Sequence, residues 1–288
     1  ANIYKACRLE MLQADPNIQM VAAAFREPFQ TNIDNFLDEL NPGDIDVFSF
    51  HQYGGGDGTD TAAIYNRADN FVVGVASARS KLNNAGFGNV PIWMNEWNIY
   101  LTFTSDLNLR FMRSEIGGVF DALAYKYTLE AGQVDAMYAW NAVDGTYGKI
   151  KDDFSRLNPP GHIMSLYNTY GVGDIKSVTT TDASKIEGYT VQQPTGEAMF
   201  SLINRSQAPQ SVNFIAGGWV PSNSTVIKHT INKSGLTVDT VQWSDVTQNA
   251  ITMGTNEVVV IATLSGGAVN NQLPLADAGI NQILSVPY

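Results

Sequence analysis

The order of apolar segments constrains this chain most, because strand-like and helix-like patterns alternate over its first 173 residues. Short apolar runs predict buried strands at 18–25, 45–50, 91–96 and 134–140. Helical periodicity predicts helices at 1–14, 31–40, 61–84, 107–131 and 160–170. Strands and helices that alternate at this spacing are typical of βαβ units. The first part of the chain is therefore expected to form an α/β fold with a parallel sheet.

The pattern changes after Gly173. Short segments that alternate or are β-branched follow one another, with Gly, Asn, Pro and Ser between them. They lie at 176–181, 188–192, 198–204, 211–216, 226–231, 237–243 and 257–264. Such spacing predicts an antiparallel β-sandwich domain over 174–265. The segment 266–272, rich in Gly and Asn, is expected to be a linker.

Composition and charge limit the classes of partner. The chain has a formal net charge of −11, yet charged residues make up only 16% of it. An acidic, weakly charged surface offers no electrostatic attraction for nucleic acid or for a membrane of anionic lipid, so neither is expected as a partner. A neutral polysaccharide needs no such attraction.

Cysteine and histidine usage give little sign of metal or redox chemistry. The single cysteine, Cys7, excludes an intrachain disulfide, and its apolar neighbours in the first predicted helix favour a buried, inert thiol. His162 and His229 lack the spacing of metal ligands, so no metal and no cofactor is expected. No apolar run reaches the length of a membrane helix.

Polar and aromatic side chains gather at the ends of three predicted strands. They are His51 and Tyr53, then Asn95, Glu96 and Trp97, then Trp140. In parallel β/α sheets, functional side chains collect where strands end, so these residues are expected to converge. A carboxylate can attack an anomeric carbon, hydrogen-bond donors can orient it, and flat rings can stack on a sugar. The set therefore predicts a glycoside hydrolase with Glu96 as its nucleophile.

Three motifs carry a family resemblance. The segments Asp46-Val-Phe-Ser-Phe-His-Gln-Tyr53 and Pro91-Ile-Trp-Met-Asn-Glu-Trp-Asn98, followed by Trp140, resemble clan A glycoside hydrolases. The likeness is strongest to family 39, the β-xylosidases and α-L-iduronidases, with marine β-agarases and β-porphyranases as near relatives. It implies that residues 1–173 are the C-terminal half of a (β/α)8 TIM barrel, strands five to eight, followed by the antiparallel β-sandwich.

The resemblance also implies roles for these residues. Glu96 would end the seventh strand as nucleophile, with His51 and Tyr53 on the sixth strand beside it. Trp140 would be the sugar platform of the eighth strand. Asn95 and Trp97, which flank Glu96, and Asp144, which follows the eighth strand, are further candidates for substrate binding.

The tryptophans outside this set have other expected roles. Trp93 is expected to pack against the helices, because side chains alternate along a strand. Trp219 and Trp243 could belong to the core of the sandwich or to a sugar-binding face, and the sequence does not decide between them.

The second catalytic carboxyl group departs from the family pattern. A retaining enzyme needs two carboxyl groups about 5–5.5 Å apart, one of them the acid/base. In clan A the acid/base glutamate ends the fourth strand, so it is expected upstream of Ala1, outside this sequence. Glu27, in Arg26-Glu27-Pro28, is a less favoured substitute because it would leave one strand–helix unit missing. Since such barrels take about 250 residues, the chain is expected to be a fragment that is inactive alone.

The final residues, 273–288, resemble the opening strand of an immunoglobulin-like module of the polycystic-kidney-disease type. Such modules are typical of secreted bacterial enzymes that degrade polysaccharides, so a secreted or cell-surface location is implied.

The expected function is that of a retaining glycoside hydrolase acting on a β-linked polysaccharide or oligosaccharide. Analogy of fold does not choose between an exo-acting xylosidase and an endo-acting galactanase of the agarase or porphyranase kind. A non-catalytic carbohydrate-binding protein on a degenerate barrel is the alternative. A structural adhesin is a third possibility, against which the residues around Glu96 argue.

Overall fold

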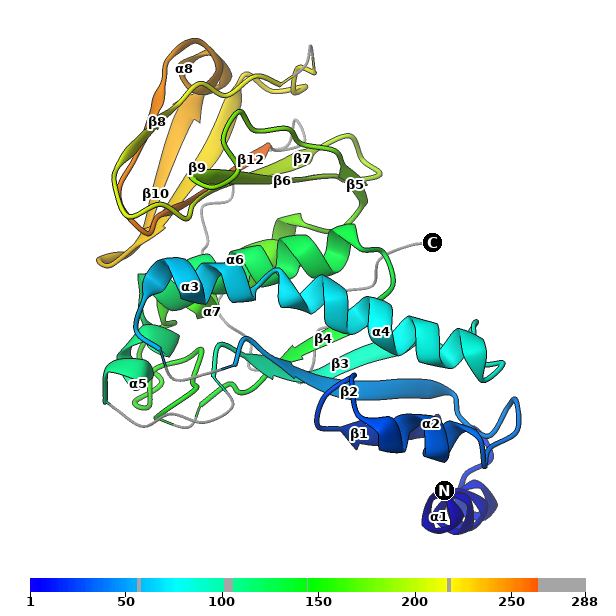
Figure 1. Cartoon of the computed structure of the whole chain (residues 1–288). Coiled ribbons are helices and arrows are strands. Elements are labelled where there is room, and N and C mark those ends of the chain that lie inside the picture. The colour runs from blue at the N-terminus through cyan, green and yellow to red at the C-terminus, as the bar shows by residue number, and fades with distance from the viewer. Residues whose placement is uncertain (56–57, 101–105, 144, 217–218, 264–288) are drawn as a thin grey trace.

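The structure is a computed structural model that describes residues 1–55, 58–100, 106–143, 145–216 and 219–263 (Figure 1). These residues form a mixed α/β fold with a four-stranded parallel sheet, a six-stranded antiparallel sheet and a two-stranded antiparallel ribbon. The predicted linker 266–272 and module 273–288 lie outside the described residues.

The parallel sheet follows the predicted order of strands. Its strands, side by side in chain order, are β1 (Val21–Phe25), β2 (Val47–Tyr53), β3 (Ile92–Asn98) and β4 (Ala136–Ala139). The helices of this part are α1 (Asn2–Ala14), α2 (Thr31–Leu37), α3 (Thr61–Arg67), α4 (Asn70–Asn84), α5 (Asp106–Arg113), α6 (Glu115–Glu130) and α7 (Pro159–Tyr170). Each of the two long predicted helices is thus two helices, and Ser114 caps α6 by accepting a hydrogen bond from the Ile116 amide.

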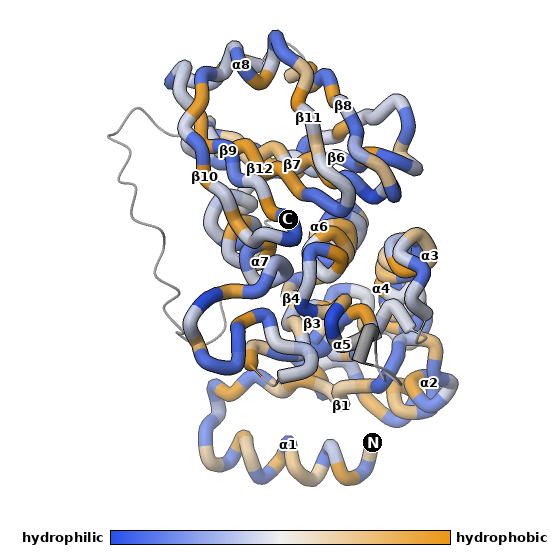
Figure 2. The backbone as a smooth tube through the Cα atoms, turned by 90° about the vertical axis from the view of Figure 1, so that its left-hand side faces the viewer, coloured by the Kyte–Doolittle hydropathy of each residue, from blue (hydrophilic) through white to orange (hydrophobic). Residues whose placement is uncertain are grey.

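Helices cover one face of the parallel sheet, with α3, α4, α6 and α7 lying between it and the antiparallel sheet (Figure 1). Phe48, Phe50 and Met94 of the sheet share a buried core with Phe71 of α4 and Phe120 of α6. The tube view places α6 between strands of the two sheets (Figure 2), and α6 packs against β6, β7, β9 and β12 as well as α4 and α7. This position explains why α6 is buried on nearly all sides.

The six-stranded sheet has a core on each face. Its strands, in spatial order, are β10 (Gly235–Gln242), β9 (Thr225–Asn232), β12 (Val258–Thr263), β7 (Ala198–Asn204), β6 (Ile186–Gln192) and β5 (Asp174–Lys176). One face joins the core of the helices, through Tyr189 and Met199 among others. The core is therefore continuous across the predicted domain boundary at Gly173.

The other face packs against α8 (Trp243–Gln248) and the ribbon of β8 (Gln210–Val212) and β11 (Ile251–Met253). Neither α8 nor β11 was predicted from the sequence. The predicted strand 237–243 ends at Gln242, whose side chain accepts from the Asp245 backbone amide while the Asp245 side chain accepts from the Gln242 amide, a capping box that starts α8.

The first helix is anchored from one side. The Tyr4 hydroxyl donates to the Asp44 carbonyl over 3.0 Å, and Arg8 Nε donates to the same carbonyl over 2.7 Å. No residue of α1 is buried, and Cys7 is exposed. The prediction of a buried thiol is wrong, because Cys7 and its apolar neighbours Ile3, Leu9 and Met11 are exposed, with no covering layer among the described residues.

Candidate active site

The face of the parallel sheet opposite the helices carries polar and aromatic side chains. Along β2, Phe48, Phe50 and Gln52 are buried on the helical side, so Ser49, His51 and Tyr53 point to the opposite face. On the same face, Trp93 of β3 contacts Tyr138 of β4, with ring centroids 5.6 Å apart.

Glu96 is held on both carboxylate oxygens from the neighbouring strand. His51 and Glu96 lie directly opposite each other in the β2–β3 pairing. The Tyr53 hydroxyl donates a hydrogen bond to Oε1 over 2.5 Å, and His51 Nδ1 lies 3.5 Å from Oε2. The side chains of His51 and Glu96 are 21% and 20% exposed, so the carboxylate is oriented and still accessible to a ligand. The structure thus brings three of the predicted site residues together.

A β-bulge in β3 turns Glu96 toward this face. Met94 pairs with Phe50 and Glu96 with His51, which leaves Asn95 as an extra residue. The pairing with β4 shows the same irregularity between Met94 and Trp97. Strict alternation would point Glu96 into the helical core beside Met94, where an ionised carboxylate would be costly. The extra residue reverses the alternation, so Glu96 leaves the core and Trp97 enters it.

The bulge overturns two predictions about tryptophan. The Trp97 side chain is fully buried and packs edge-on against Phe71 of α4 and Tyr125 of α6. This position is incompatible with the predicted contact between Trp97 and substrate. Trp93 was expected in the helical core, but it is only partly buried and lies on the face that Glu96 occupies.

Two asparagines flank the carboxylate. Asn95 is partly buried, and its Oδ1 accepts no hydrogen bond from the described residues. Asn98 is fully buried; its side-chain amide donates to the Trp140 carbonyl and, over 3.5 Å, to the Tyr147 carbonyl. Sequence reasoning missed Asn98, whose position at the end of the Asn-Glu-Trp-Asn segment was the available signal.

Of the remaining candidates, Trp140, Asp144 and Glu27, the two that the structure describes form no hydrogen bond or ion pair with Glu96. Trp140 is 43% exposed, and its peptide bond to Asn141 is cis. Asp144 lies outside the described residues. Glu27 is exposed two residues beyond β1, and β2 lies between β1 and β3, the strand that carries Glu96.

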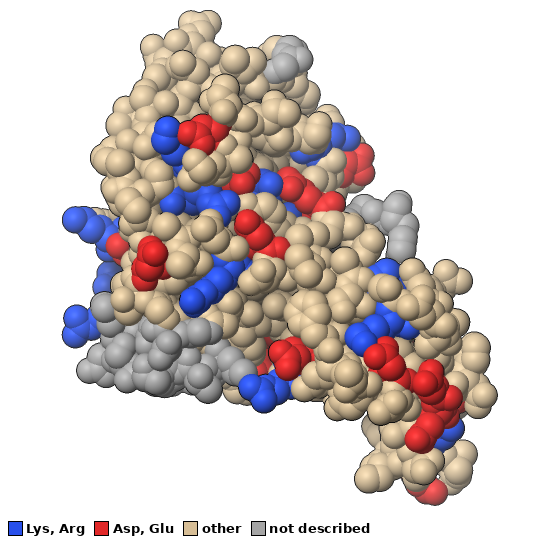
Figure 3. Space-filling view, in the orientation of Figure 1, with Lys and Arg blue, Asp and Glu red and all other residues tan. Residues whose placement is uncertain are grey.

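Charged side chains are unevenly distributed over the face of the molecule shown in Figure 3. On this face, basic and acidic side chains are interspersed over the helices, and much of the antiparallel sheet is uncharged. Within the described ranges, no group of three or more His, Cys, Asp or Glu side chains could hold a metal ion. No helix among the described residues is long and apolar enough to cross a membrane.

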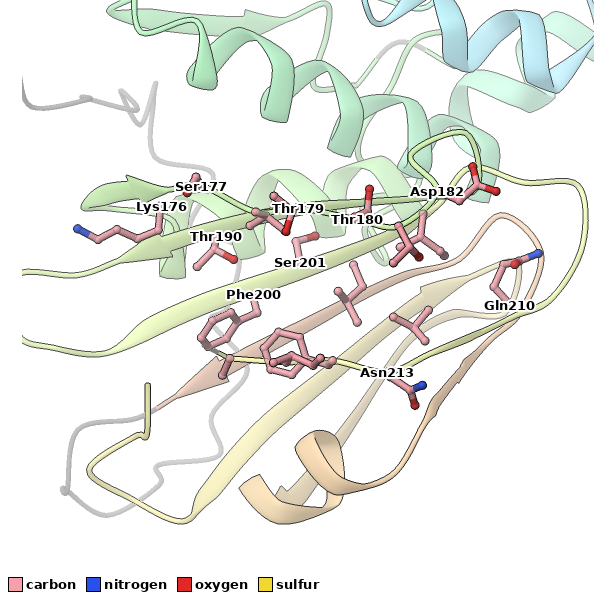
Figure 4. A pocket seen from close by; sticks show the side chains of 18 of the residues that line it. Lys176, Ser177, Thr179, Thr180, Asp182, Thr190, Phe200, Ser201, Gln210 and Asn213 are labelled. Carbon is pink, nitrogen blue, oxygen red and sulfur yellow. The ribbon is translucent and has the colours of Figure 1, made fainter. Parts of the chain in front are cut away.

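A separate cavity of about 960 Å³ lies on the outer face of β5, β6 and β7 (Figure 4). Its lining includes Thr179, Thr190, Phe200 and Asn213, and none of the predicted site residues. Trp219 also lines it, packs edge-on against Trp243, and like Trp243 contacts Phe200. For the buried Trp243 the structure favours the core; Trp219 is partly buried and lines the cavity, so both roles stay open for it.

Comparisons with known proteins agree with this fold. No protein-family model matches the sequence, and no curated protein matches it. An α-L-arabinofuranosidase from Thermotoga maritima superposes with a TM-score of 0.68 at 15% identity, over 90% of this chain and 60% of that chain. A family 51 α-L-arabinofuranosidase from Thermotoga petrophila gives 0.66 at 16% identity, over 91% and 61%. A family 44 xyloglucanase from Paenibacillus polymyxa gives 0.67 at 11% identity, over 91% and 60%.

The chain spans about 60% of the length of these solved structures. At such identities the likeness shows the fold alone, which is a mixed α/β fold shared with TIM-barrel glycosidases. The narrower resemblance to family 39 stays a prediction.

Proposed function

We propose that the chain is part of a retaining glycoside hydrolase in which Glu96 is the nucleophile. The observation that carries this proposal is the orientation of Glu96 by Tyr53 and His51, at the end of a strand and on the face opposite the helices. A structural carboxylate would be expected to pair with a buried cation, whereas Glu96 is accessible and held by a phenol and an imidazole. The glycosidase fold supports the same assignment.

The two carboxylate oxygens have different tasks in this mechanism. Oε1 is anchored by the hydrogen bond from Tyr53, whereas Oε2 makes the longer contact with His51 and so can attack. A bond forms between Oε2 and the anomeric carbon as the glycosidic bond breaks, and the leaving oxygen takes a proton from the acid/base. The acid/base then removes a proton from water, which attacks the anomeric carbon and releases Glu96.

We further propose that the acid/base is a glutamate outside these 288 residues. The consecutive order of β1 to β4 and the 60% coverage of the glycosidases support assignment of these strands as five to eight of a barrel. The antiparallel sheet with its facing ribbon would then be the β-sandwich domain. The proposed substrate is a β-linked polysaccharide or oligosaccharide, which would stack on Trp140. The enzyme is proposed to act outside the cell.

The test uses the longer parent protein, with the sequence upstream of Ala1, and activated aryl glycosides of xylose and galactose. Glu96→Ala should abolish turnover, and azide should restore it by forming a glycosyl azide in place of the enzyme ester. Glu27→Ala is the matched control and should keep its activity. If Glu96→Ala retains activity without azide, the nucleophile assignment is wrong. Sugar binding without hydrolysis by the wild type would favour the non-catalytic alternative.

A further inference from the structure

A buried ion pair lies behind the strand that carries Glu96. Lys149, which follows β4, donates from Nζ to Asp121 Oδ2 of α6 over 2.6 Å. The two side chains are 4% and 0% exposed. Burial of two charges carries a desolvation cost that often cancels their attraction, so well-packed apolar residues would commonly be as stable. The pair is therefore better explained by what it fixes than by the stability it adds.

The ammonium group of Lys149 links α6 to β3. Besides Asp121 of α6, Nζ faces the ring of Trp97, 5.0 Å from its centroid, and Trp97 directly follows Glu96 on β3. Asp121 Oδ1 has no hydrogen-bond partner among the described residues, so Lys149 is the group that compensates this carboxylate. Burial raises the pKa of Asp121, and the charge of Lys149 opposes that rise.

Hydrogen bonds join the two ends of the segment 140–149, whose residue 144 lies outside the described residues, and link its start to β3. The Lys149 amide donates to the Asn141 carbonyl over 3.1 Å, and the Ile150 amide donates to the Ala142 carbonyl over 2.9 Å. The Asn98 side chain ties the Trp140 carbonyl to the end of β3. The segment therefore leaves β4 at Trp140 and returns beneath the site at Lys149.

The α7 side fixes the same backbone. The Asn158 side-chain amide donates to the Gly148 carbonyl and the Asn158 backbone amide to the Lys149 carbonyl, each over 2.9 Å. A Cβ atom at Gly161 would lie 2.2 Å from the Lys149 carbonyl oxygen, so the helix approaches as closely as a glycine allows.

We propose that Asp121 and Lys149 are positioning residues that hold the segment 140–149 against β3, and so hold Trp140 against Trp97 and Asn98 at the end of the strand that carries Glu96. The catalytic part of this inference rests on the proposed function. The structural part, which is that the ion pair orders the segment, is independent of the proposed function.

The test replaces both charges at once, so that no lone charge is left buried. The double variant Asp121→Leu with Lys149→Met should keep the thermal midpoint within a few degrees, because apolar replacement of a buried pair is commonly tolerated. Amide hydrogen exchange over 141–149 should become faster. In the longer parent protein, kcat/KM should fall about 10- to 100-fold through displacement of Trp140. The rise in KM should be larger for an oligosaccharide than for an aryl glycoside.

Lys228→Met, which removes a part-exposed ion pair with Asp239 on the antiparallel sheet, is the control and should change neither measurement. Asp121→Asn keeps the shape of the side chain and is the second variant if the double variant does not fold; it should also speed exchange over 141–149. Wild-type exchange in either folded variant would overturn the inference. If the wild-type longer parent protein is inactive, only the proposed function is contradicted. The hydrogen-exchange result tests the structural claim independently.

Discussion

Tyr53 donates its phenolic hydrogen to Oε1 of Glu96 from two residues beyond His51, the direct partner of Glu96 in the β2–β3 pairing. Tyr53 is thus two positions from direct pairing with Glu96, a diagonal separation that a long aromatic side chain can span. The orientation of the carboxylate therefore follows from the register of β2 and β3, the two central strands of the parallel sheet.

We predict that Tyr53→Phe lowers kcat about 10- to 100-fold, because a carboxylate without its anchor samples unproductive orientations. KM should change little, because the Tyr53 hydroxyl bonds to Glu96 rather than to the substrate. The measurement is steady-state kinetics of the longer parent protein on an aryl glycoside. Tyr138→Phe, on the same face of β4, removes a hydroxyl without altering Glu96 and should be close to wild type. An unchanged kcat in Tyr53→Phe would show that Tyr53 does not orient Glu96.

A polar network joins the helices to the antiparallel sheet and predicts a stability effect. Arg205 donates to the Tyr127 hydroxyl over 2.8 Å and to Asn66 Oδ1 over 2.7 Å, and it pairs with Glu187 at 3.4 Å. The Arg205 and Glu187 side chains are only 7% and 11% exposed. Arg205→Met removes the donors to Tyr127 and Asn66, while Glu187 keeps the Tyr127 hydroxyl and Lys126, 3.4 Å away, as partners. The free energy of unfolding should therefore fall by about 2 kcal/mol.

Urea denaturation monitored by tryptophan fluorescence measures this loss. Lys176→Met is the matched control, because Lys176 pairs with Asp174 at the surface, where the side chains are 46% and 74% exposed. Its effect should stay within about 0.5 kcal/mol. Similar effects in the two variants would mean that the Arg205 network contributes no more than a surface pair.

His229 predicts an acid-dependent stability. Its ring is buried in β9 beside Tyr170, and neither ring nitrogen has a hydrogen-bond partner in the described part of the chain. Burial lowers the pKa of His229 from 6.5 to about 4, with His162 acting in the same direction. The unfolded chain therefore binds a proton in a pH range where the folded protein does not.

The stabilising contribution is complete above pH 6.5 and is lost as the pH falls toward 4. Between pH 7.5 and pH 5, the free energy of unfolding should decrease by about 2 kcal/mol from this group. Denaturation of wild type and His229→Leu at both pH values isolates the contribution of His229 to the free energy of unfolding, because the other titrating groups are common to both proteins. Equal losses in the two proteins would contradict the assignment.

Much of the fold could be predicted because the apolar pattern along this chain is local. The strand 198–204 was predicted with the bounds that β7 has, and each predicted parallel strand overlaps an observed one. Gly132 and Pro159 show why helix ends were close to correct: Gly132 follows α6 with a positive φ of 63°, and Pro159 begins α7.

The parts that were missed depend on single insertions or on distant partners. One extra residue at Asn95 reverses which side chains of β3 face the core, and period-two reasoning has no means to detect it. The partners Asp121 and Lys149 lie 28 positions apart, and the Asn98 side chain bonds a carbonyl 42 positions away. Such contacts exist only after the strands have paired, so the sequence pointed to Glu96, His51 and Tyr53 but not to the buried contacts behind them.

The most direct measurement is covalent trapping of the nucleophile. The longer parent protein would be incubated with an activated 2-deoxy-2-fluoro glycoside, which slows release of the glycosyl-enzyme ester. Peptide mass mapping should then find one glycosyl adduct, on Glu96 within the segment Pro91–Asn98, and none in Glu96→Gln. An adduct on another carboxylate such as Glu27, with Glu96 unmodified in an active enzyme, would contradict the account.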